Sequence, residues 1–284
     1  MILKKIILFI FLGIIVQCKS TELSKIKNKS IIPFGISYAR LTPDQVANYN
    51  MVILEPDFYT PADIHKFKQK GPTVIAYVTL GEVDKYRWYY PDLEEIGFLG
   101  INENWDSPFL DLEDPETRKL MIEKVIPRIM DKGVDGLFLD TVDAVSPYTS
   151  RKHLAPYMLE LIKEIRKAYP STIIIQNAGL FLLEETKDVV DAVAIEDIAT
   201  MYDFDTKEYR IVTDEEYDAR MDLVRNHSKQ SGLPFLIIDF AVTPETISKV
   251  SNRLRAEGFP YFISNISLDT LPTNPAVITN LKEQ

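Results

Sequence analysis

Eight short runs of apolar residues recur between residues 34 and 265, and they constrain the fold more than any other feature. Each run is continuously apolar and does not alternate with polar residues, which is typical of strands covered on both faces, as in a parallel sheet. The runs span residues 34–40, 51–56, 73–80, 136–140, 172–177, 191–196, 235–241 and 261–265. The pattern predicts eight buried parallel strands.

Segments with helical periodicity separate these runs. The predicted helices span residues 42–49, 60–70, 114–133, 150–169, 213–230 and 243–258. The first three open with a capping Thr or Asp followed by Pro, which is pre-organised for the first helical position. Pro127 should kink the third helix, because proline lacks a backbone donor.

Strands and helices that alternate in this way predict a single-domain (βα)8 TIM barrel of the α/β class. The chain of 284 residues suits one such barrel, which takes about 250 residues. A doubly wound open sheet is the alternative fold. No G-x-G-x-x-G turn follows a predicted strand, so nucleotide binding is disfavoured. We identify no repeat or second domain and expect a monomer without a cofactor.

Two connections are longer than a strand-to-helix turn needs. One, residues 81–113, follows the third predicted strand, and the other, residues 197–213, follows the sixth. Both should lie at the C-terminal face of the barrel, where active sites sit. Long loops in compact domains are usually functional.

The pattern of the N-terminal residues predicts a targeting segment. Two lysines precede an apolar run at residues 6–16, which is too short to span a bilayer and fits a signal peptide over residues 1–17. Cys18, the single cysteine, follows directly and resembles the lipidated first residue of a bacterial lipoprotein, although Gln17 replaces the usual small residue. A plain secretory signal is the alternative.

A signal peptide implies an extracytoplasmic protein, which is either anchored to a membrane through Cys18 or secreted. Residues 18–30 are polar and would tether the domain, residues 31–284, to the membrane. The formal net charge is −10, and no basic cluster lies beyond the N-terminus, so nucleic acid is not an expected partner. The acidic balance serves solubility and would also suit a cationic ligand.

Acidic residues follow the predicted strands at the C-terminal face: Glu55, Glu82, Asp140, Asp143, Glu196 and Asp239. Each alone could cap a helix, but several converging carboxylates suit shared acid–base work. The three histidines fall in predicted helices, which disfavours a histidine-based triad or metal site. Acids without histidine fit glycoside hydrolysis, in which two carboxyl groups flank the scissile bond, and also fit a hard divalent metal.

Aromatic residues gather in the long loop after the third strand. Tyr86, Trp88 and Trp105 lie there, and the faces of such rings suit sugars. The same rings could instead pack the loop onto the barrel. Asn177, at the end of the fifth strand, could donate a hydrogen bond to a sugar hydroxyl or cap a helix.

Several stretches together resemble glycoside hydrolase family 114, the endo-α-1,4-polygalactosaminidase group of TIM barrels. These are AYVTLGEVDKYRWY, FLDLEDPETR, GVDGLFLDTVD, IIIQNAG and AIEDI, and the similarity runs from about residue 33 to residue 265. The resemblance implies a catalytic acid at the fourth strand end and a glutamate at the sixth, which here are Asp140 and Glu196. It also implies substrate contacts from Glu82, Tyr86 and Arg87.

We therefore expect a glycosidase that cleaves an extracellular polysaccharide, such as an α-1,4-linked galactosamine polymer. Asp140 would act as the nucleophile and Glu196 as the general acid and then base. The full set of expected substrate contacts is Glu55, Glu82, Tyr86, Arg87, Trp88, Trp105, Asp143, Asn177 and Asp239.

Two other functions fit parts of the pattern. A non-catalytic, surface-anchored carbohydrate-binding lipoprotein would use the tryptophan loop but would not need two acids at cleavage geometry. A metal-dependent barrel enzyme would use Glu55, Asp140, Glu196 and Asp239 as oxygen ligands.

Overall fold

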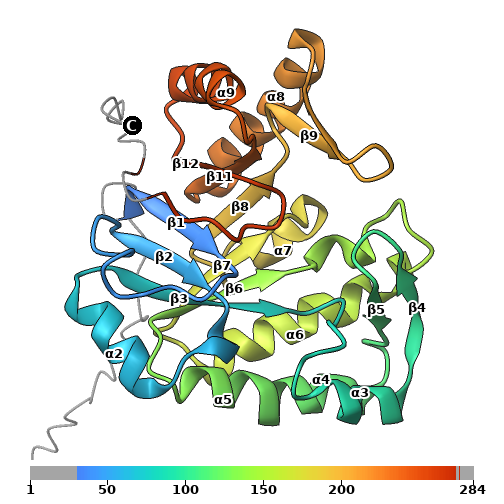
Figure 1. Ribbon diagram of the computed structural model, residues 1–284. Coiled ribbons are helices and arrows are strands. Elements are labelled where there is room, and N and C mark those ends of the chain that lie inside the picture. The colour runs from blue at the N-terminus through green and yellow to red at the C-terminus, as the bar shows by residue number, and fades with distance from the viewer. Residues whose placement is uncertain (1–30, 273–274, 276–284) are drawn as a thin grey trace, which may run out of the picture.

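The computed structural model describes residues 31–272 and residue 275. The predicted signal peptide, the tether and Cys18 lie outside these residues. Within them, eight parallel strands curl into a barrel that helices surround (Figure 1). No helix of the described part is long and apolar enough to cross a membrane.

The barrel strands follow one another in chain order around the sheet. They are β1 (Phe34–Ser37), β2 (Met51–Leu54), β3 (Thr73–Thr79), β6 (Gly136–Asp140), β7 (Ile173–Asn177), β8 (Ala192–Glu196), β11 (Phe235–Phe240) and β12 (Tyr261–Ser264). Every hydrogen-bonded pair among them is parallel. The first and last strands meet where the rings of Phe34 and Phe262 lie 6.0 Å apart. The predicted (βα)8 barrel is confirmed, and each strand falls within its predicted run.

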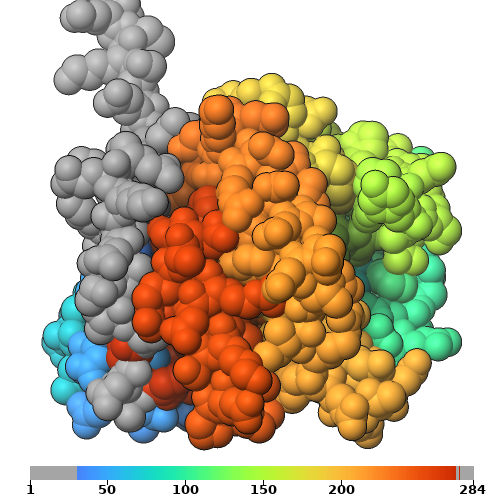
Figure 2. All heavy atoms as spheres, turned by 90° about the horizontal axis from the view of Figure 1, so that it is seen from above, coloured from blue at the N-terminus to red at the C-terminus, as the bar shows by residue number. Residues whose placement is uncertain are grey.

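The larger helices are α2 (Pro61–Gln69), α6 (Ala155–Ala168), α8 (Asp214–Ser231) and α9 (Pro244–Glu257). Three of them begin at a capping threonine, whereas α6 follows Leu154 and has no side-chain cap. Thr60, Thr213 and Thr243 each accept a hydrogen bond from the third helical residue in a capping box. Figure 2 shows that α8 and α9 form much of the face seen from above.

The predicted helix over residues 42–49 is wrong, because this segment forms a series of tight turns. The amide of Gln45 donates to the carbonyl of Thr42, and that of Tyr49 donates to Val46, three residues back in each case. Val46 and Tyr49 are buried in the core. A segment this short cannot propagate a helix on its own, so its tertiary contacts decide its conformation.

The predicted helix over residues 114–133 forms as three pieces. These are α4 (Pro115–Leu120), a π-helical turn (Met121–Val125) and α5 (Ile126–Met130). Within the turn, the amide of Ile126 donates to the carbonyl of Met121, five residues earlier. The irregularity expected at Pro127 is therefore a widened turn just before it, which accommodates the missing backbone donor.

Two antiparallel hairpins occupy the long connections. After β3 the chain forms a short helix, α3 (Tyr90–Ile96), and then the hairpin β4 (Phe98–Asn102) and β5 (Ser107–Leu110). After β8 it forms the hairpin β9 (Thr200–Asp203) and β10 (Glu208–Ile211). In Figure 1 both hairpins extend to the side where the barrel strands end, as expected for insertions at the C-terminal face.

A buried ion pair stabilises the opposite end of the barrel. Arg166 of α6 lies 2.6 Å from Asp191, just before β8, and both side chains are almost fully buried. Arg166 also donates to the carbonyls of Val189 and Thr172. The amide of Ile174 donates to the same carboxylate. The pair thus joins α6 to the beginnings of β7 and β8.

Replacing Asp191 by Ala should lower the free energy of unfolding by about 3–5 kcal/mol, because Arg166 would remain buried without its counter-charge. Denaturant unfolding measures the change. The matched control is Asp188→Ala, which removes an exposed aspartate from the same loop. This control should change the free energy of unfolding by less than about 0.5 kcal/mol. Equal stability of the two variants would contradict the role assigned to the pair.

Candidate active site

A cavity of about 660 Å³ opens at the carboxyl ends of the barrel strands, a volume suited to a small ligand or to part of a chain. The predicted site residues that line it are Glu55, Glu82, Tyr86, Arg87, Trp105, Asp140, Asp143, Asn177 and Glu196. Trp88 and Asp239 are not among the lining residues. Most of the predicted site is therefore brought together in one place.

At the centre of the cavity, one amide group joins two carboxylates. The side-chain nitrogen of Asn177 donates to Asp140 Oδ1 at 2.7 Å and to Glu196 Oε1 at 2.9 Å. Two hydrogen bonds from one nitrogen limit the separation of these oxygens to about 5.6 Å, the combined length of the bonds. Because β6, β7 and β8 are neighbours in the sheet, their last residues meet at the same rim.

The backbone turns sharply directly after each of these three residues. Thr141, Ala178 and Asp197 have φ angles of 57°, 54° and 58°. These values lie in the left-handed region that non-glycine residues rarely adopt. The turns direct the chain away from the rim while the preceding side chains face the cavity. Left-handed residues at three consecutive strand ends indicate strain held at a functional site.

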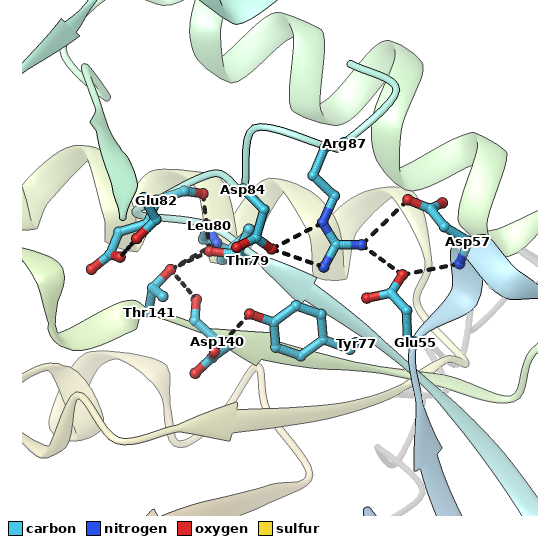
Figure 3. Close-up of polar contacts among 11 residues, drawn as sticks. Glu55, Asp57, Tyr77, Thr79, Leu80, Glu82, Asp84, Arg87, Asp140 and Thr141 are labelled. Carbon is cyan, nitrogen blue, oxygen red and sulfur yellow. Dashed lines mark hydrogen bonds and ion pairs between the residues drawn. The ribbon is translucent and has the colours of Figure 1, made fainter. Parts of the chain in front are cut away.

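The strained turn at Thr141 is supported by the end of β3. The Thr141 hydroxyl accepts hydrogen bonds from the amides of Leu80 and Gly81 at 3.2 and 2.8 Å (Figure 3). A side chain at Gly81 would meet the Thr141 carbonyl at 2.5 Å, so this close approach requires glycine. The position of Asp140 is therefore fixed by its own strand and by the neighbouring one.

Tyr77 on β3 also holds Asp140, although its place in an apolar run of the sequence does not distinguish it from a core aromatic. Its hydroxyl donates to Asp140 Oδ2 at 2.9 Å (Figure 3). The ring of Tyr38 packs against it with centroids 4.6 Å apart. Burial, and next the charge of Asp140, raises the pKa of Tyr77 well above its usual value, so the hydroxyl keeps its proton. Both oxygens of Asp140 thus accept a hydrogen bond.

Glu196 differs electrostatically from Asp140. Burial of its carboxyl group, followed by the nearby charge of Asp140, raises the pKa of Glu196 to about 8. It therefore holds a proton at neutral pH, whereas the two donors on Asp140 suit an ionised carboxylate. One proton donor and one carboxylate side by side are what acid–base chemistry needs.

Glu82 anchors the β4–β5 hairpin to the barrel. It accepts hydrogen bonds from the amide of Asn102, at 3.1 and 3.2 Å to its two oxygens, and from the hydroxyl of Ser107. Burial raises the pKa of Glu82 despite these donors. Although Glu82 lines the cavity, its oxygens are already engaged within the protein.

Asp239 has an equivalent role for the β9–β10 hairpin. It is fully buried and accepts hydrogen bonds from the amides of Ala199 and Thr200, both at 2.8 Å, and from the Thr200 hydroxyl at 2.6 Å. The expected substrate contact of Asp239 is corrected on this basis, because the side chain lies at the base of the hairpin and not in the cavity.

Arg87 and Glu55 form a neutral pair in the cavity wall. Arg87 Nη1 lies 2.6 Å from Glu55, and further carboxylates from Asp57 and Asp84 lie 3.3 Å from the guanidinium (Figure 3). Only 5% of the Arg87 side chain is exposed. The guanidinium also lies 5.4 Å from the ring of Tyr77. The charges of Arg87 and Glu55 therefore compensate each other, and Arg87 also contacts the ring of Tyr77.

The two tryptophans have different surroundings. Trp105, in the β4–β5 turn, lines the cavity and is 52% exposed. Trp88 packs instead against helix residues, with the guanidinium of Arg128 4.2 Å from its ring and Lys124 at 5.7 Å. The expected substrate contact of Trp88 is corrected for this reason. Asp143 and Tyr86 lie exposed at the edge of the cavity.

The suggested set of metal ligands does not assemble. Glu55 is paired with Arg87, and Asp239 is saturated by hydrogen bonds outside the cavity. Among the residues that the structure describes, no group of three or more His, Cys, Asp or Glu side chains could hold a metal ion. The donor arrangement therefore does not fit the metal site considered above.

A parallel (βα)8 barrel with two carboxyl groups held together at its C-terminal rim is the arrangement that TIM-barrel glycosidases use. The sequence model of Glycoside-hydrolase family GH114 matches residues 27–277. The chain belongs to this family and is a glycoside hydrolase.

The chain is also similar to solved structures and to curated relatives. The glycoside hydrolase domain of PelA from Pseudomonas aeruginosa is 26% identical, with a TM-score of 0.74 over 84% of this chain and 96% of that domain. Aspergillus fumigatus Ega3, solved in complex with galactosamine, shares the fold at 15% identity and a TM-score of 0.70, covering 88% and 96% of the two chains. An uncharacterized protein of Methanocaldococcus jannaschii is 28% identical over 89% of this chain and 82% of its own length.

Proposed function

We propose that this protein hydrolyses an extracellular polysaccharide of amino sugars, such as α-1,4-linked galactosamine, with Asp140 and Glu196 as its catalytic pair. The observation that carries the proposal is the single amide of Asn177, which joins the two carboxyl groups. A module that only binds carbohydrate needs no such pair. Membership of the family and the galactosamine bound to Ega3 support the sugar class.

The geometry supports a double-displacement mechanism with retention of the anomeric configuration. Retaining glycosidases hold their two carboxyl groups about 5–5.5 Å apart, and inverting ones hold them about 6.5–9.5 Å apart to admit a water molecule. The bound of about 5.6 Å between Asp140 Oδ1 and Glu196 Oε1 favours the shorter arrangement.

In the first step, the Asp140 carboxylate attacks the anomeric carbon while the bond from that carbon to the leaving oxygen breaks. Glu196 gives its proton to the leaving oxygen, for which a pKa of about 8 keeps it protonated at neutral pH. In the second step, ionised Glu196 takes a proton from water as the water oxygen attacks the anomeric carbon and releases Asp140. The enzyme returns to its starting state.

The charge of the cavity supports a cationic substrate. The acids that line it are Glu55, Glu82, Asp84, Asp140, Asp143, Glu196 and Asp197, and Arg87 is the one arginine among the described lining residues. Arg87 is itself paired with Glu55. A polymer of free amino sugars carries positive charge, so a cavity with this excess of carboxylates would concentrate it near the catalytic pair.

The extracytoplasmic location belongs to the same proposal and rests on the sequence of residues 1–30. A signal peptide over residues 1–17, with lipidation at Cys18, would place the barrel outside the cytoplasm. Mass spectrometry of the mature N-terminus tests it: a lipid-modified Cys18 is expected, and an unmodified residue 1 would contradict it.

Cleavage of a cationic galactosamine polymer should slow as salt rises. We expect kcat/KM to fall about tenfold between about 20 and 200 mM NaCl, because screening weakens attraction to the acidic cavity. A fully N-acetylated, uncharged oligosaccharide is the matched control, and any turnover of it should not respond to salt. A flat salt response with the cationic polymer would remove the electrostatic argument for this substrate.

A further inference from the structure

The two hairpins that follow β3 and β8 meet beside the cavity through a chain of aromatic rings. Trp105 of the β4–β5 turn contacts Phe204 of the β9–β10 turn, with ring centroids 5.1 Å apart and an interplanar angle of 78°. Phe204 contacts Tyr202 at 5.1 Å, and Tyr202 contacts Tyr209 at 4.9 Å. We call these four residues the aromatic arch.

The arch is attached at its far end to another part of the barrel. The amide of Ile266, in the loop after β12, donates to the Tyr209 hydroxyl at 3.0 Å. Both Ile266 and Trp105 line the cavity. The arch therefore links the loop after β3 to the loop after β12 beside the cavity, and in Figure 1 both hairpins extend to this side.

Both hairpins are held firmly at their bases. Glu82 binds both strands of the β4–β5 hairpin through Asn102 and Ser107. Asp239, fully buried, binds the start of the β9–β10 hairpin through Thr200. Anchored bases and a shared contact at the tips leave little freedom for the rings, so a ligand that binds them loses little entropy in ordering them.

We propose that Trp105 is a sugar-binding platform for a residue of the polysaccharide outside the cleavage point, and that Phe204 is the positioning residue that fixes its ring. Phe204 meets Trp105 edge to face, a geometry that orients the indole. The Trp105 side chain nevertheless stays largely exposed beside the cavity. An exposed ring on the wall of a cavity can present its apolar face to a bound sugar. This inference rests on the function proposed above.

The platform predicts an effect on long substrates alone. Trp105→Ala should raise KM for the galactosamine polymer about five- to tenfold and leave kcat within about twofold. Hydrolysis of a small aryl galactosaminide, which is too short to reach the platform, should be unchanged. Phe204→Ala should raise KM for the polymer about threefold, and the double variant should match Trp105→Ala, because Phe204 acts through Trp105. Tyr148→Ala removes an exposed aromatic that does not line the cavity and should have no effect.

Fluorescence gives a readout that a merely structural role would not change. Trp88 and Trp105 are the two tryptophans of the chain, so a Trp88→Phe, Glu196→Gln protein reports on Trp105 alone without cleaving its ligand. Galactosamine oligosaccharides should change its emission in a saturable way, and Phe204→Ala in this background should weaken the affinity about threefold. Tyr148→Ala in this background should leave the affinity unchanged.

The outcomes separate this inference from the proposed function. If the wild-type protein cleaves the polymer but Trp105→Ala leaves KM unchanged, the platform is refuted and the glycosidase assignment stands. If the wild-type protein cleaves no amino-sugar polymer, the proposed substrate fails. The fluorescence titration then decides the platform, which is refuted when the emission of Trp105 responds to no oligosaccharide.

Discussion

Asp140→Asn should lower kcat/KM on the polysaccharide by at least about 10³-fold, since the amide cannot attack the anomeric carbon. Asparagine has the same shape, and the Tyr77 hydroxyl, which now donates to Asp140 Oδ2, can turn and accept a hydrogen bond from it. The fold should therefore be preserved. Initial rates of reducing-end release, with a melting curve for each protein, measure the effect.

Asp143→Asn is the matched control for Asp140→Asn. Asp143 lies three residues along the chain and lines the same cavity, but Asn177 does not join it to Glu196. Its replacement should lower kcat/KM by less than about tenfold. Comparable losses in the two variants would mean that general loss of negative charge, and not loss of the nucleophile, explains the result.

Glu196→Gln should lower kcat/KM on the polysaccharide by about 10²–10⁴-fold, because the leaving sugar oxygen then receives no proton. The loss should be much smaller for formation of the glycosyl-enzyme from an aryl glycoside whose phenolate leaves without protonation. A burst of phenolate followed by slow turnover is the expected course, since the second step still lacks its base. The opposite pattern, with Asp140→Asn giving the burst, would reverse the two roles.

The pH dependence of kcat/KM in the wild-type enzyme reports on the proton that Glu196 carries. Glu196 must be protonated in the first step, and burial together with Asp140 raises its pKa to about 8. The value of kcat/KM on the polysaccharide should stay level as pH rises toward 8 and then fall about tenfold for each further pH unit. With the aryl glycoside that needs no protonation, this fall in the rate of phenolate release should disappear. A fall centred near the ordinary pKa of glutamate, about 4.3, would contradict the assignment.

The barrel could be predicted from the sequence because buried strands and helix caps produce local sequence patterns. All eight strands lie within predicted runs, and the Thr–Pro pairs at residues 60–61 and 243–244 open helices as expected. The same Thr–Pro signal at residues 42–43 opens no helix, because residues 42–49 are too few to propagate one against competing tertiary contacts. The hairpins within the long connections left no comparable local signal.

Most residues of the site could be predicted because the carboxyl ends of parallel strands converge at one rim of a barrel. That rule placed Asp140, Asn177 and Glu196 on the same rim, but it did not show that Asn177 joins the other two. It also failed for Asp239, whose carboxylate accepts hydrogen bonds from backbone amides at the start of the β9–β10 hairpin. Position along a strand thus gives the rim that a residue occupies and not the direction of its side chain.

The remaining features depend on contacts between distant parts of the chain. Thr141, at the left-handed turn after Asp140, is a residue type that does not signal such a turn. Phe204 contacts Trp105 from a remote part of the sequence, between two insertions whose paths are set by Glu82 and Asp239. Tyr77 lies inside an apolar run and has no feature that distinguishes it from a core aromatic.

The most direct test of this account is product analysis on a panel of polysaccharides that includes de-N-acetylated α-1,4-galactosamine polymer. The wild-type protein should release short galactosamine oligosaccharides with new reducing ends, and Glu196→Gln, at the same concentration and with the same melting temperature, should release almost none. Release of the same products at a similar rate by Glu196→Gln would contradict the central claim that Asp140 and Glu196 form the catalytic pair.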